Sequence, residues 1–330
     1  MERLRIAVVG LGKMGLLHAS ILNVMPSVEV IALCDKSLWL LKFVKKLFKT
    51  AQVVDDVEKL ADLDLDSVYL TTPIPIHFPV AKALYLKRVT SNLFVEKTLA
   101  SSWDKAKELC ELAQRCGGVN MVGYMKRFAV TFCKAKSILN QGILGEITSF
   151  EACAYSSDFS GINKSSKVPA SRGGVLGDLG AHVIDLALWF FGDLEVDSAV
   201  LESMVDGGCE DSAHFRVKKS GLEGQVNVSW CMDNYRLPDF ELMISGHRGV
   251  MKVNDDNLEL KLKDGTSSTW YRHDLNDNVN FLLGEREYYR EDEYFVRSVL
   301  TGNNAEPSFE TASKVDYIID QVKRKASKSV

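Results

Sequence analysis

The chain has 330 residues, which is long enough for two domains that each bury a core of their own. Its formal net charge is −4, with acidic and basic residues mixed, which argues against nucleic acid as the main partner. No apolar run reaches the roughly 18 residues of a membrane span, and no signal-peptide cleavage pattern is present, so we expect a cytoplasmic protein without a membrane partner. The 7 cysteines lack metal-ligand spacing, so no disulfide, metal site or redox dithiol is predicted.

The first apolar segment, from Arg5 to Val9, runs directly into three glycines with the spacing G-x-G-x-x-G. This pattern predicts a strand, a tight turn at Gly10, and a helix that Gly15 allows to pack closely on the strand. Gly12 lets the backbone approach a pyrophosphate, which the amides at the start of the helix favour. An ordinary strand-to-helix turn would give a similar pattern. The cofactor-binding candidates in this turn are Gly10, Gly12, Lys13, Met14 and Gly15.

A second apolar strand, from Val28 to Cys34, ends in Asp35, about 20 residues beyond the third glycine. A carboxylate at this position accepts hydrogen bonds from the ribose 2′-hydroxyl of NAD and repels the 2′-phosphate of NADP. Lys36 would partly accommodate that phosphate, so NADP is not excluded, and a solvated turn residue is the plain alternative for Asp35. We expect NAD as the cofactor.

Helical and strand patterns alternate as far as residue 123, which predicts crossover units and a doubly wound parallel sheet of the Rossmann type. The strand at 66–72 runs into Pro73 at the edge of the sheet where ligands bind. Thr72 and Pro73 are therefore cofactor-binding candidates. His77 begins the next helix and is counted with them, although a packing or capping role fits it equally well. The remaining elements of this half are predicted at 38–48, 52–54, 92–96, 101–116 and 119–123.

Lys97 lies just past the predicted strand at 92–96. In a doubly wound sheet this location faces the nicotinamide end of the cofactor, where an amine would hydrogen-bond a substrate hydroxyl or carbonyl. The usual role of a lysine after a strand is only a solvated charge. Glu96 and Lys97 are both counted as cofactor-binding candidates, and Lys97 also as a catalytic and substrate-binding one.

The pattern changes after residue 123, so we divide the chain into a dinucleotide-binding domain, residues 1–123, and a substrate-binding and oligomerisation domain, residues 124–330. Long alternating strands predict an α+β domain with a large, mostly antiparallel, open-faced sheet. One face of this sheet is free to meet helices and the other to meet a second subunit. A helix is predicted to end near 140, strands at 147–155, 195–204, 213–217, 224–230, 240–245, 249–253 and 258–262, and further helices at 292–300 and 309–325.

The segment 173–192 interrupts these strands with a helix that is almost entirely apolar or small. Its exceptions are Asp178, His182 and Asp185, which steps of four and three residues place on one narrow stripe. Burying such groups is costly unless they are paired or face a cleft, so the stripe is expected to line a polar cleft. Asp178 would then orient the His182 ring as a general base for a secondary alcohol. The alternative is a structural Asp-His hydrogen bond.

These motifs, in this order, resemble those of the glucose-fructose oxidoreductase, inositol dehydrogenase and MocA family. The resemblance rests on the glycine turn, Thr72-Pro73 with His77, Glu96-Lys97, and Gly174 followed by Asp178, Gly180, His182 and Asp185. It implies an NAD(P)-dependent oxidoreductase of sugars, inositols or related polyols, with Lys97, Asp178 and His182 as the catalytic residues. It also implies an N-terminal Rossmann domain, and homodimers or homotetramers formed through the C-terminal sheet.

Two segments depart from the family pattern or extend the candidate site. Thr98 stands where the family usually has proline, which is a change in the local backbone that aims Lys97. Residues 124–128 keep the family's Arg-Phe ending. The substrate-binding candidates are Lys97, Tyr124, Arg127, Arg172, Asp178 and His182.

The loop from Asp158 to Arg172 precedes the catalytic helix and is expected to cover the substrate. Its basic residues Lys164, Lys167 and Arg172 hint at an anionic substrate such as a uronate or a nucleotide sugar, although a solvated loop is simpler. We expect hydride transfer between NAD and a secondary alcohol. Two alternatives are an NAD-dependent glycoside-cleaving enzyme of the same fold and a cofactor-binding regulator without turnover.

Overall fold

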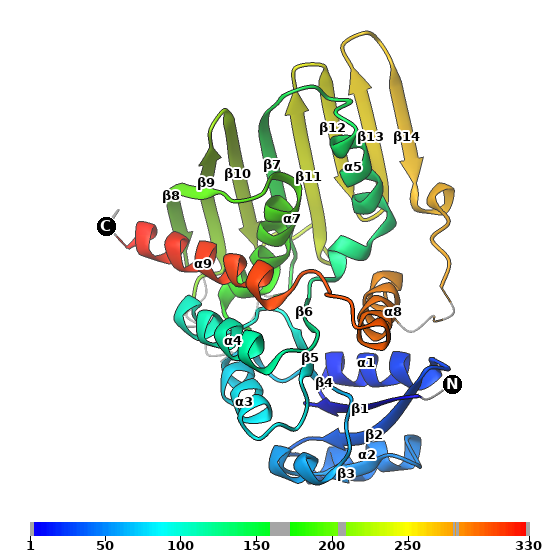
Figure 1. The fold of residues 1–330 in the computed structure, drawn as a ribbon. Coiled ribbons are helices and arrows are strands. Elements are labelled where there is room, and N and C mark those ends of the chain that lie inside the picture. The colour runs from blue at the N-terminus through cyan, green and yellow to red at the C-terminus, as the bar shows by residue number, and fades with distance from the viewer. Residues whose placement is uncertain (1–2, 159–171, 204–208, 280, 282–283, 328–330) are drawn as a thin grey trace. The chain divides into compact units, whose positions relative to one another are not determined.

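The computed structural model describes residues 3–158, 172–203, 209–279, 281 and 284–327 (Figure 1). The expectations for Lys164 and Lys167 therefore lie outside the described residues. Contacts divide the chain into two compact units. The first comprises Met1–Tyr124 and Val279–Ser313, and the second Met125–Asn278 and Lys314–Val330.

The first unit is built on a parallel six-stranded sheet with the order β3-β2-β1-β4-β5-β6. This order has the topological switch point of a doubly wound sheet between β1 and β4, and it confirms the predicted Rossmann fold. The middle of β1 is fully buried at Ile6, Ala7 and Val8, as expected of a strand covered on both faces. The strands are β1 (Leu4–Val9), β2 (Val28–Cys34), β3 (Gln52–Val54), β4 (Ser67–Leu70), β5 (Asn92–Glu96) and β6 (Asn120–Gly123).

Helices of the first unit come from both ends of the sequence. α3 and α4 pack on each other, and α8, from near the end of the chain, packs on α1 (Figure 1). Ser37 caps the start of α2, since its hydroxyl accepts a hydrogen bond from the Leu40 amide, and Gly302 caps the end of α8 in the left-handed conformation. The helices are α1 (Lys13–Val24), α2 (Leu38–Leu47), η1 (Val57–Asp62), α3 (Ile74–Leu86), α4 (Trp103–Cys116) and α8 (Arg286–Thr301).

The second unit is built on an eight-stranded sheet with the order β14-β13-β12-β11-β7-β10-β9-β8. Every neighbouring pair is antiparallel except β10 and β7, which confirms the predicted mostly antiparallel sheet. The edge strand β14 was not predicted. The strands are β7 (Ile147–Tyr155), β8 (Glu195–Glu202), β9 (Ser212–Lys219), β10 (Leu222–Ser229), β11 (Asp239–Gly246), β12 (Gly249–Asn254), β13 (Asn257–Leu262) and β14 (Ser267–Tyr271).

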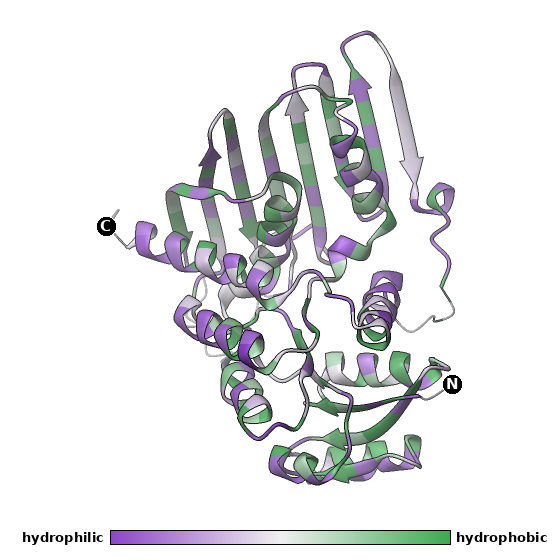
Figure 2. Cartoon of the chain, in the orientation of Figure 1, coloured by the Kyte–Doolittle hydropathy of each residue, from purple (hydrophilic) through white to green (hydrophobic). Residues whose placement is uncertain are grey.

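One face of this sheet is apolar and covered, and the other is polar. Along β7 the buried residues Phe150, Ala152 and Ala154 alternate with partly exposed ones, and Figure 2 shows the same banding along neighbouring strands. α5 and α7 pack on the apolar face (Figure 1). The remaining helices of this unit are η2 (Met125–Phe128), α5 (Val130–Asn140), the π-helical turn η3 (Leu176–Gly180), α7 (Ala181–Phe191) and η4 (Arg272–Leu275).

The last helix, α9 (Phe309–Ala326), starts in the first unit and continues in the second. Phe309 contacts the ring of Tyr85 in the first unit, whereas Lys314 pairs with Asp193 in the second. Across the described residues, no helix combines the length and the hydropathy that a membrane crossing requires.

Candidate active site

The glycine turn between β1 and α1 uses its three glycines in different ways. Gly10 has a φ of 91°, and a Cβ there would lie 2.7 Å from the Thr72 amide nitrogen. A Cβ on Gly15 would overlap the carbonyl oxygen of Gly10. A Cβ on Gly12, in contrast, would meet nothing within 4 Å. The fold itself therefore needs Gly10 and Gly15, while Gly12 leaves open space at the start of α1, where a pyrophosphate would approach.

Thr71, which the sequence patterns did not single out, holds this turn from β4. Its hydroxyl donates to the carbonyl oxygen of Gly10 at 2.6 Å and lies 3.1 Å from that of Val9. The neighbouring Thr72 packs against Gly10, and Pro73 immediately precedes α3. The end of β4 thus supports the glycine turn directly.

Asp35 lies beside the same turn. Its Oδ2 accepts the Leu11 amide at 2.7 Å, and its Oδ1 accepts the Ser37 amide at 2.8 Å. Lys36 is turned to Asp56, with 2.7 Å between Nζ and Oδ2. The cation that would have favoured a 2′-phosphate is therefore paired with a carboxylate, so the local charge favours NAD over NADP.

His77 is fully buried and contacts two backbone carbonyls. Its Nδ1 lies 2.8 Å from the oxygen of Thr98, and its Nε2 lies 2.6 Å from that of Thr72. Burial lowers the pKa of His77, and the contacts to the Thr98 and Thr72 carbonyls oppose that shift. Of the two roles considered for His77, these contacts favour a packing residue that links the loops after β4 and β5.

Lys97 follows β5 directly and is partly buried. Its peptide bond to Thr98 is cis. Its backbone N–H donates to Oε2 of Glu96 at 3.0 Å, and Oε1 of Glu96 lies 2.9 Å from Nε2 of His18. The Glu96 carboxylate is thus engaged with groups of the first unit itself, and its candidate role in cofactor binding is at most indirect.

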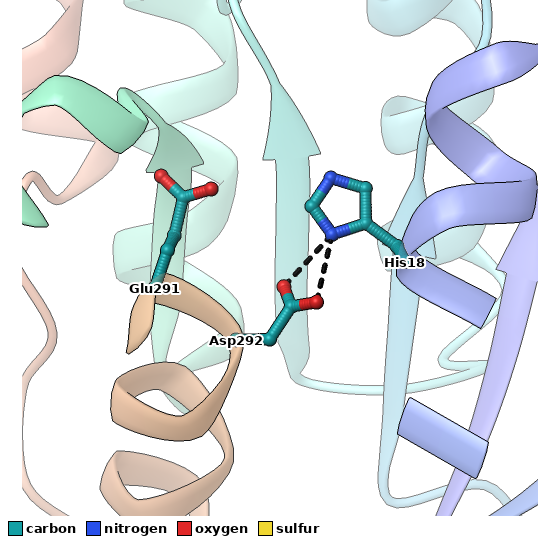
Figure 3. A group of neighbouring side chains, drawn as sticks. All are labelled: His18, Glu291 and Asp292. Atoms are coloured by element: carbon teal, nitrogen blue, oxygen red, sulfur yellow. Dashed lines mark hydrogen bonds and ion pairs between the residues drawn. The ribbon is translucent and has the colours of Figure 1, made fainter. Parts of the chain in front are cut away.

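His18 on α1 and Asp292 on α8 form a buried pair (Figure 3). With Glu291 they offer three side chains whose ligand atoms lie within 4.8 Å of one another. Both ring nitrogens of His18 lie at hydrogen-bond distance from carboxyl oxygens, however, so these groups already engage one another and we assign no metal to them. Burial by itself lowers the pKa of His18, but Asp292 and Glu96 outweigh it and raise that pKa well above its ordinary value. The two carboxylates therefore favour the imidazolium form of the ring.

In the second unit, Asp178 lies in the π-helical turn η3 and Arg172 just before it. Nη1 of Arg172 is 3.2 Å from Oδ2 of Asp178 and 3.0 Å from Oδ2 of Asp158. Two carboxylates thus share the positive charge of Arg172. The predicted stripe assumed an uninterrupted α-helix, and the π-turn changes the direction in which Asp178 leaves the helix axis relative to His182.

His182 is the second residue of α7 and is 6% exposed. Its ring and that of Phe240 lie nearly perpendicular, with 5.3 Å between their centroids. Phe240 also contacts Lys126, whose Nζ lies 4.8 Å from the centroid of the Phe240 ring. The same Nζ lies 2.8 Å from Oδ1 of Asp255. Lys126 was not among the expected residues, because nothing in its local sequence indicates a buried lysine.

Asp185, one turn after His182, is not part of a cleft-lining stripe. Arg127 binds it through two parallel hydrogen bonds, Nε to Oδ2 at 2.8 Å and Nη2 to Oδ1 at 2.7 Å. The two side chains are only 7% and 1% exposed. Arg127 therefore anchors α7, the helix that carries His182. Tyr124, another substrate-binding candidate, is fully buried.

Two family profiles match the chain. Residues 4–124 match the profile described as the oxidoreductase family with an NAD-binding Rossmann fold, and residues 132–252 match the GFO/IDH/MocA C-terminal domain. The chain belongs to the GFO/IDH/MocA family. The resemblance noted from the motifs is thereby confirmed, together with the NAD-binding Rossmann domain and the assignment as an oxidoreductase.

Several proteins named as oxidoreductases or dehydrogenases are similar in sequence. The uncharacterized oxidoreductase YdgJ of Escherichia coli (strain K12) is 26% identical over 84% of this chain and 80% of its own length. D-glucoside 3-dehydrogenase of the same strain is 27% identical over 63% of this chain and 60% of its own length. The scyllo-inositol 2-dehydrogenase (NAD(+)) of Bacillus subtilis (strain 168) is 24% identical over 58% of this chain and 55% of its own length. The chain thus spans less than two thirds of the two named dehydrogenases.

Solved structures share the fold over the whole chain. A levoglucosan dehydrogenase in complex with NADH has a TM-score of 0.89 at 21% identity and covers 99% of this chain and 98% of its own. GenD2 from gentamicin A biosynthesis, in complex with NAD, has a TM-score of 0.82 at 25% identity, with 100% and 96% covered.

Proposed function

We propose that the protein is an NAD-dependent dehydrogenase that oxidises a secondary alcohol of a sugar, an inositol or a related polyol. Family membership supports the reaction class, and two relatives carry the names of a glucoside 3-dehydrogenase and an inositol 2-dehydrogenase. Both names point to a hydroxyl on a polyhydroxylated ring. The comparison names thus support the substrate class, and the chain's own residues support the roles below.

The first unit carries the observation on which the proposal depends most. The glycine turn, the Thr71 support and Lys97 follow β1, β4 and β5, which are adjacent parallel strands. Carboxyl ends of adjacent parallel strands lie at one edge of the sheet, which is where open α/β sheets bind ligands. Gly12 and Asp35 would hold the cofactor at its pyrophosphate and ribose, and bound NAD supplies the hydride acceptor.

In this proposal, Lys97 donates a hydrogen bond to the reacting oxygen and stabilises the negative charge that develops on it. His182 accepts the proton of the substrate hydroxyl, and Asp178 supports it in that role. Arg127 acts differently from the substrate-binding role expected from the sequence, since Asp185 occupies its guanidinium. It holds α7, and His182 with it.

The experiment is a screen for NADH formation with sugars, inositols, uronates and nucleotide sugars, and with NAD and NADP as alternative cofactors. The proposal expects NADH with at least one compound, and losses of about 10²–10⁴-fold in kcat for Lys97→Ala and His182→Ala with NAD binding intact. Lys105→Ala, which removes an exposed lysine on α4, serves as the matched control and should keep full activity. Free sugar released without NADH would indicate glycoside cleavage, and silence across the panel would indicate a regulator; either result contradicts the proposal.

Arg172 does not favour an anionic substrate, because Asp158 and Asp178 share its charge. Uronates and nucleotide sugars remain in the screen because the sequence of the preceding loop is basic. Preference for a neutral polyol is the expected result.

We also propose that copies of this chain associate through the polar face of the eight-stranded sheet. Val200 on β8 and Val250 on β12 are 55% and 40% exposed there. Light scattering should show a dimer or tetramer, and Val250→Lys should shift it toward the monomer. A wild-type monomer at all concentrations would contradict this.

A further inference from the structure

A chain of hydrogen bonds runs from α8 through His18 to the backbone of Lys97. Nδ1 of His18 lies 2.8 and 3.0 Å from the two oxygens of Asp292. Figure 3 shows these two contacts. Nε2 lies 2.9 Å from Oε1 of Glu96. The other oxygen of Glu96 accepts the N–H of Lys97 at 3.0 Å. His18 and Asp292 are fully buried, and Glu96 is 7% exposed.

The geometry of these groups favours a charged ring. An ionised carboxylate only accepts hydrogen bonds, so a neutral imidazole would place one nitrogen lone pair against a carboxylate oxygen. An imidazolium donates on both sides and offsets part of the buried negative charge. The rest of the ring is surrounded by aromatic side chains, with centroids of Tyr69, Phe94 and Tyr288 at 5.7, 5.2 and 6.0 Å. Water therefore has little access to replace either contact.

We propose that His18 is the positioning residue of Lys97. As a buried imidazolium it fixes the Glu96 carboxylate, and through that carboxylate the peptide from which the Lys97 side chain departs. This inference rests on the proposed role of Lys97 in the dehydrogenase reaction. It does not give His18 a place at the reacting atoms.

The other side of the same turn is held by a second buried histidine. His77 contacts the carbonyl oxygen of Thr98 through Nδ1 at 2.8 Å and that of Thr72 through Nε2. Lys97 thus lies between two contacts made by buried rings, one acting on its amide through Glu96 and the other acting on the following residue. Such fixing from both sides limits the directions in which the Lys97 amine can point, which is what catalysis by a positioned group requires.

The test compares His18→Gln and Asp292→Asn with Glu287→Gln as a matched control. Glu287 is a fully buried carboxyl side chain on the same helix as Asp292, five residues earlier, so its substitution alters a buried carboxyl group in the same way. Two readouts are used: kcat and KM for NADH formation, and amide hydrogen exchange of a peptide covering residues 93–99. The exchange readout needs no turnover.

The proposal expects His18→Gln and Asp292→Asn to lower kcat by about 10–100-fold with little change in KM for NAD, and to speed exchange at residues 93–99. Glu287→Gln should lower only the melting temperature. If both test variants have a lower melting temperature but the same kcat and the same amide exchange at residues 93–99 as Glu287→Gln, His18 has only a structural role and the inference is wrong. Should His18→Gln not fold, Asp292→Asn carries the same test. Wild-type protein that is silent in the substrate screen contradicts the proposed function instead, and the exchange readout still decides the role of His18.

Discussion

The ion pair between Arg127 and Asp185 allows a prediction whose size can be worked out from the structure. Arg127→Met removes one partner and leaves the Asp185 carboxylate 1% exposed and uncompensated. Breaking a buried pair in this way costs about 3–5 kcal/mol of unfolding free energy. Each kcal/mol moves the melting temperature of a unit of this size by roughly 2–4 °C, so we expect a fall of about 6–20 °C.

Removing both charges should be much less harmful than removing one. In Arg127→Met/Asp185→Leu no buried charge is left without a partner, and replacing a buried pair by apolar groups is often nearly neutral. Thermal and urea denaturation, followed by circular dichroism, measure the effect in the full chain. The same single variant should lower kcat, because α7 carries His182 on the turn before Asp185.

Arg248→Met is the control for this series, because Arg248 is exposed and makes one long contact to the Gly142 carbonyl, at 3.2 Å. It should stay within about 0.5 kcal/mol of the wild type. The reasoning is refuted if Arg127→Met also stays within about 1 kcal/mol of the wild type, or if the double variant is as unstable as the two single losses added together.

Three further predictions concern the first unit. Gly15→Ala should unfold the glycine turn, because its Cβ overlaps the Gly10 carbonyl oxygen, whereas Gly12→Ala should fold normally and bind NAD more weakly; thermal shifts with and without NAD separate the two. Asp35→Ser should weaken NAD binding by about tenfold, or about 1.4 kcal/mol, and strengthen NADP binding. The KM for each cofactor measures both effects. Because its folded pKa is raised, His18 stabilises the fold fully below its ordinary pKa of about 6.5 and loses that contribution as the pH rises through the raised folded value. As the pH rises above about 6.5, the melting temperature of the wild type should therefore fall more steeply than that of His18→Gln.

Each of these predictions has a result that contradicts it. Equal stability of the two glycine variants would show that the turn relaxes around a Cβ. If the ratio of the KM values for NAD and NADP is unchanged in Asp35→Ser, the Asp35 carboxylate does not determine cofactor selectivity. Parallel melting curves against pH for the wild type and His18→Gln would mean that the ring is not charged in the folded protein.

Much of the first unit could be predicted from local sequence. The apolar run into G-x-G-x-x-G, the acidic end of the next strand and the alternation of periodicities are all short-range patterns, and they indicated the parallel sheet that the structure has. The same holds for Lys97, whose place after β5 follows from one apolar strand. Such signals are local because each strand or helix is set by its own periodicity and its own turn residues.

The contacts that hold the candidate residues are not local, and no periodicity encodes them. His18 and Asp292 are 274 positions apart, and Arg127 and Asp185 are 58 apart. When the partner of a polar residue is distant in sequence, the apolar helix around that residue does not reveal the partner, and a cleft is predicted instead. The prediction for Asp185 was wrong for this reason. The return of α8 to the first unit and the parallel pairing of β10 with β7 likewise depend on tertiary packing.

The most direct test of the central claim is a double-variant cycle on Lys97 and His182, measured as single-turnover NADH formation with a substrate from the screen. If both side chains act on the same substrate hydroxyl, each alanine variant loses about 10²–10⁴-fold and the double variant loses little more than the worse single variant, since residues that act as a unit are non-additive. NAD affinity should stay near that of the wild type in all three variants. Full turnover in either single variant, or losses that simply multiply in the double variant, would contradict the account.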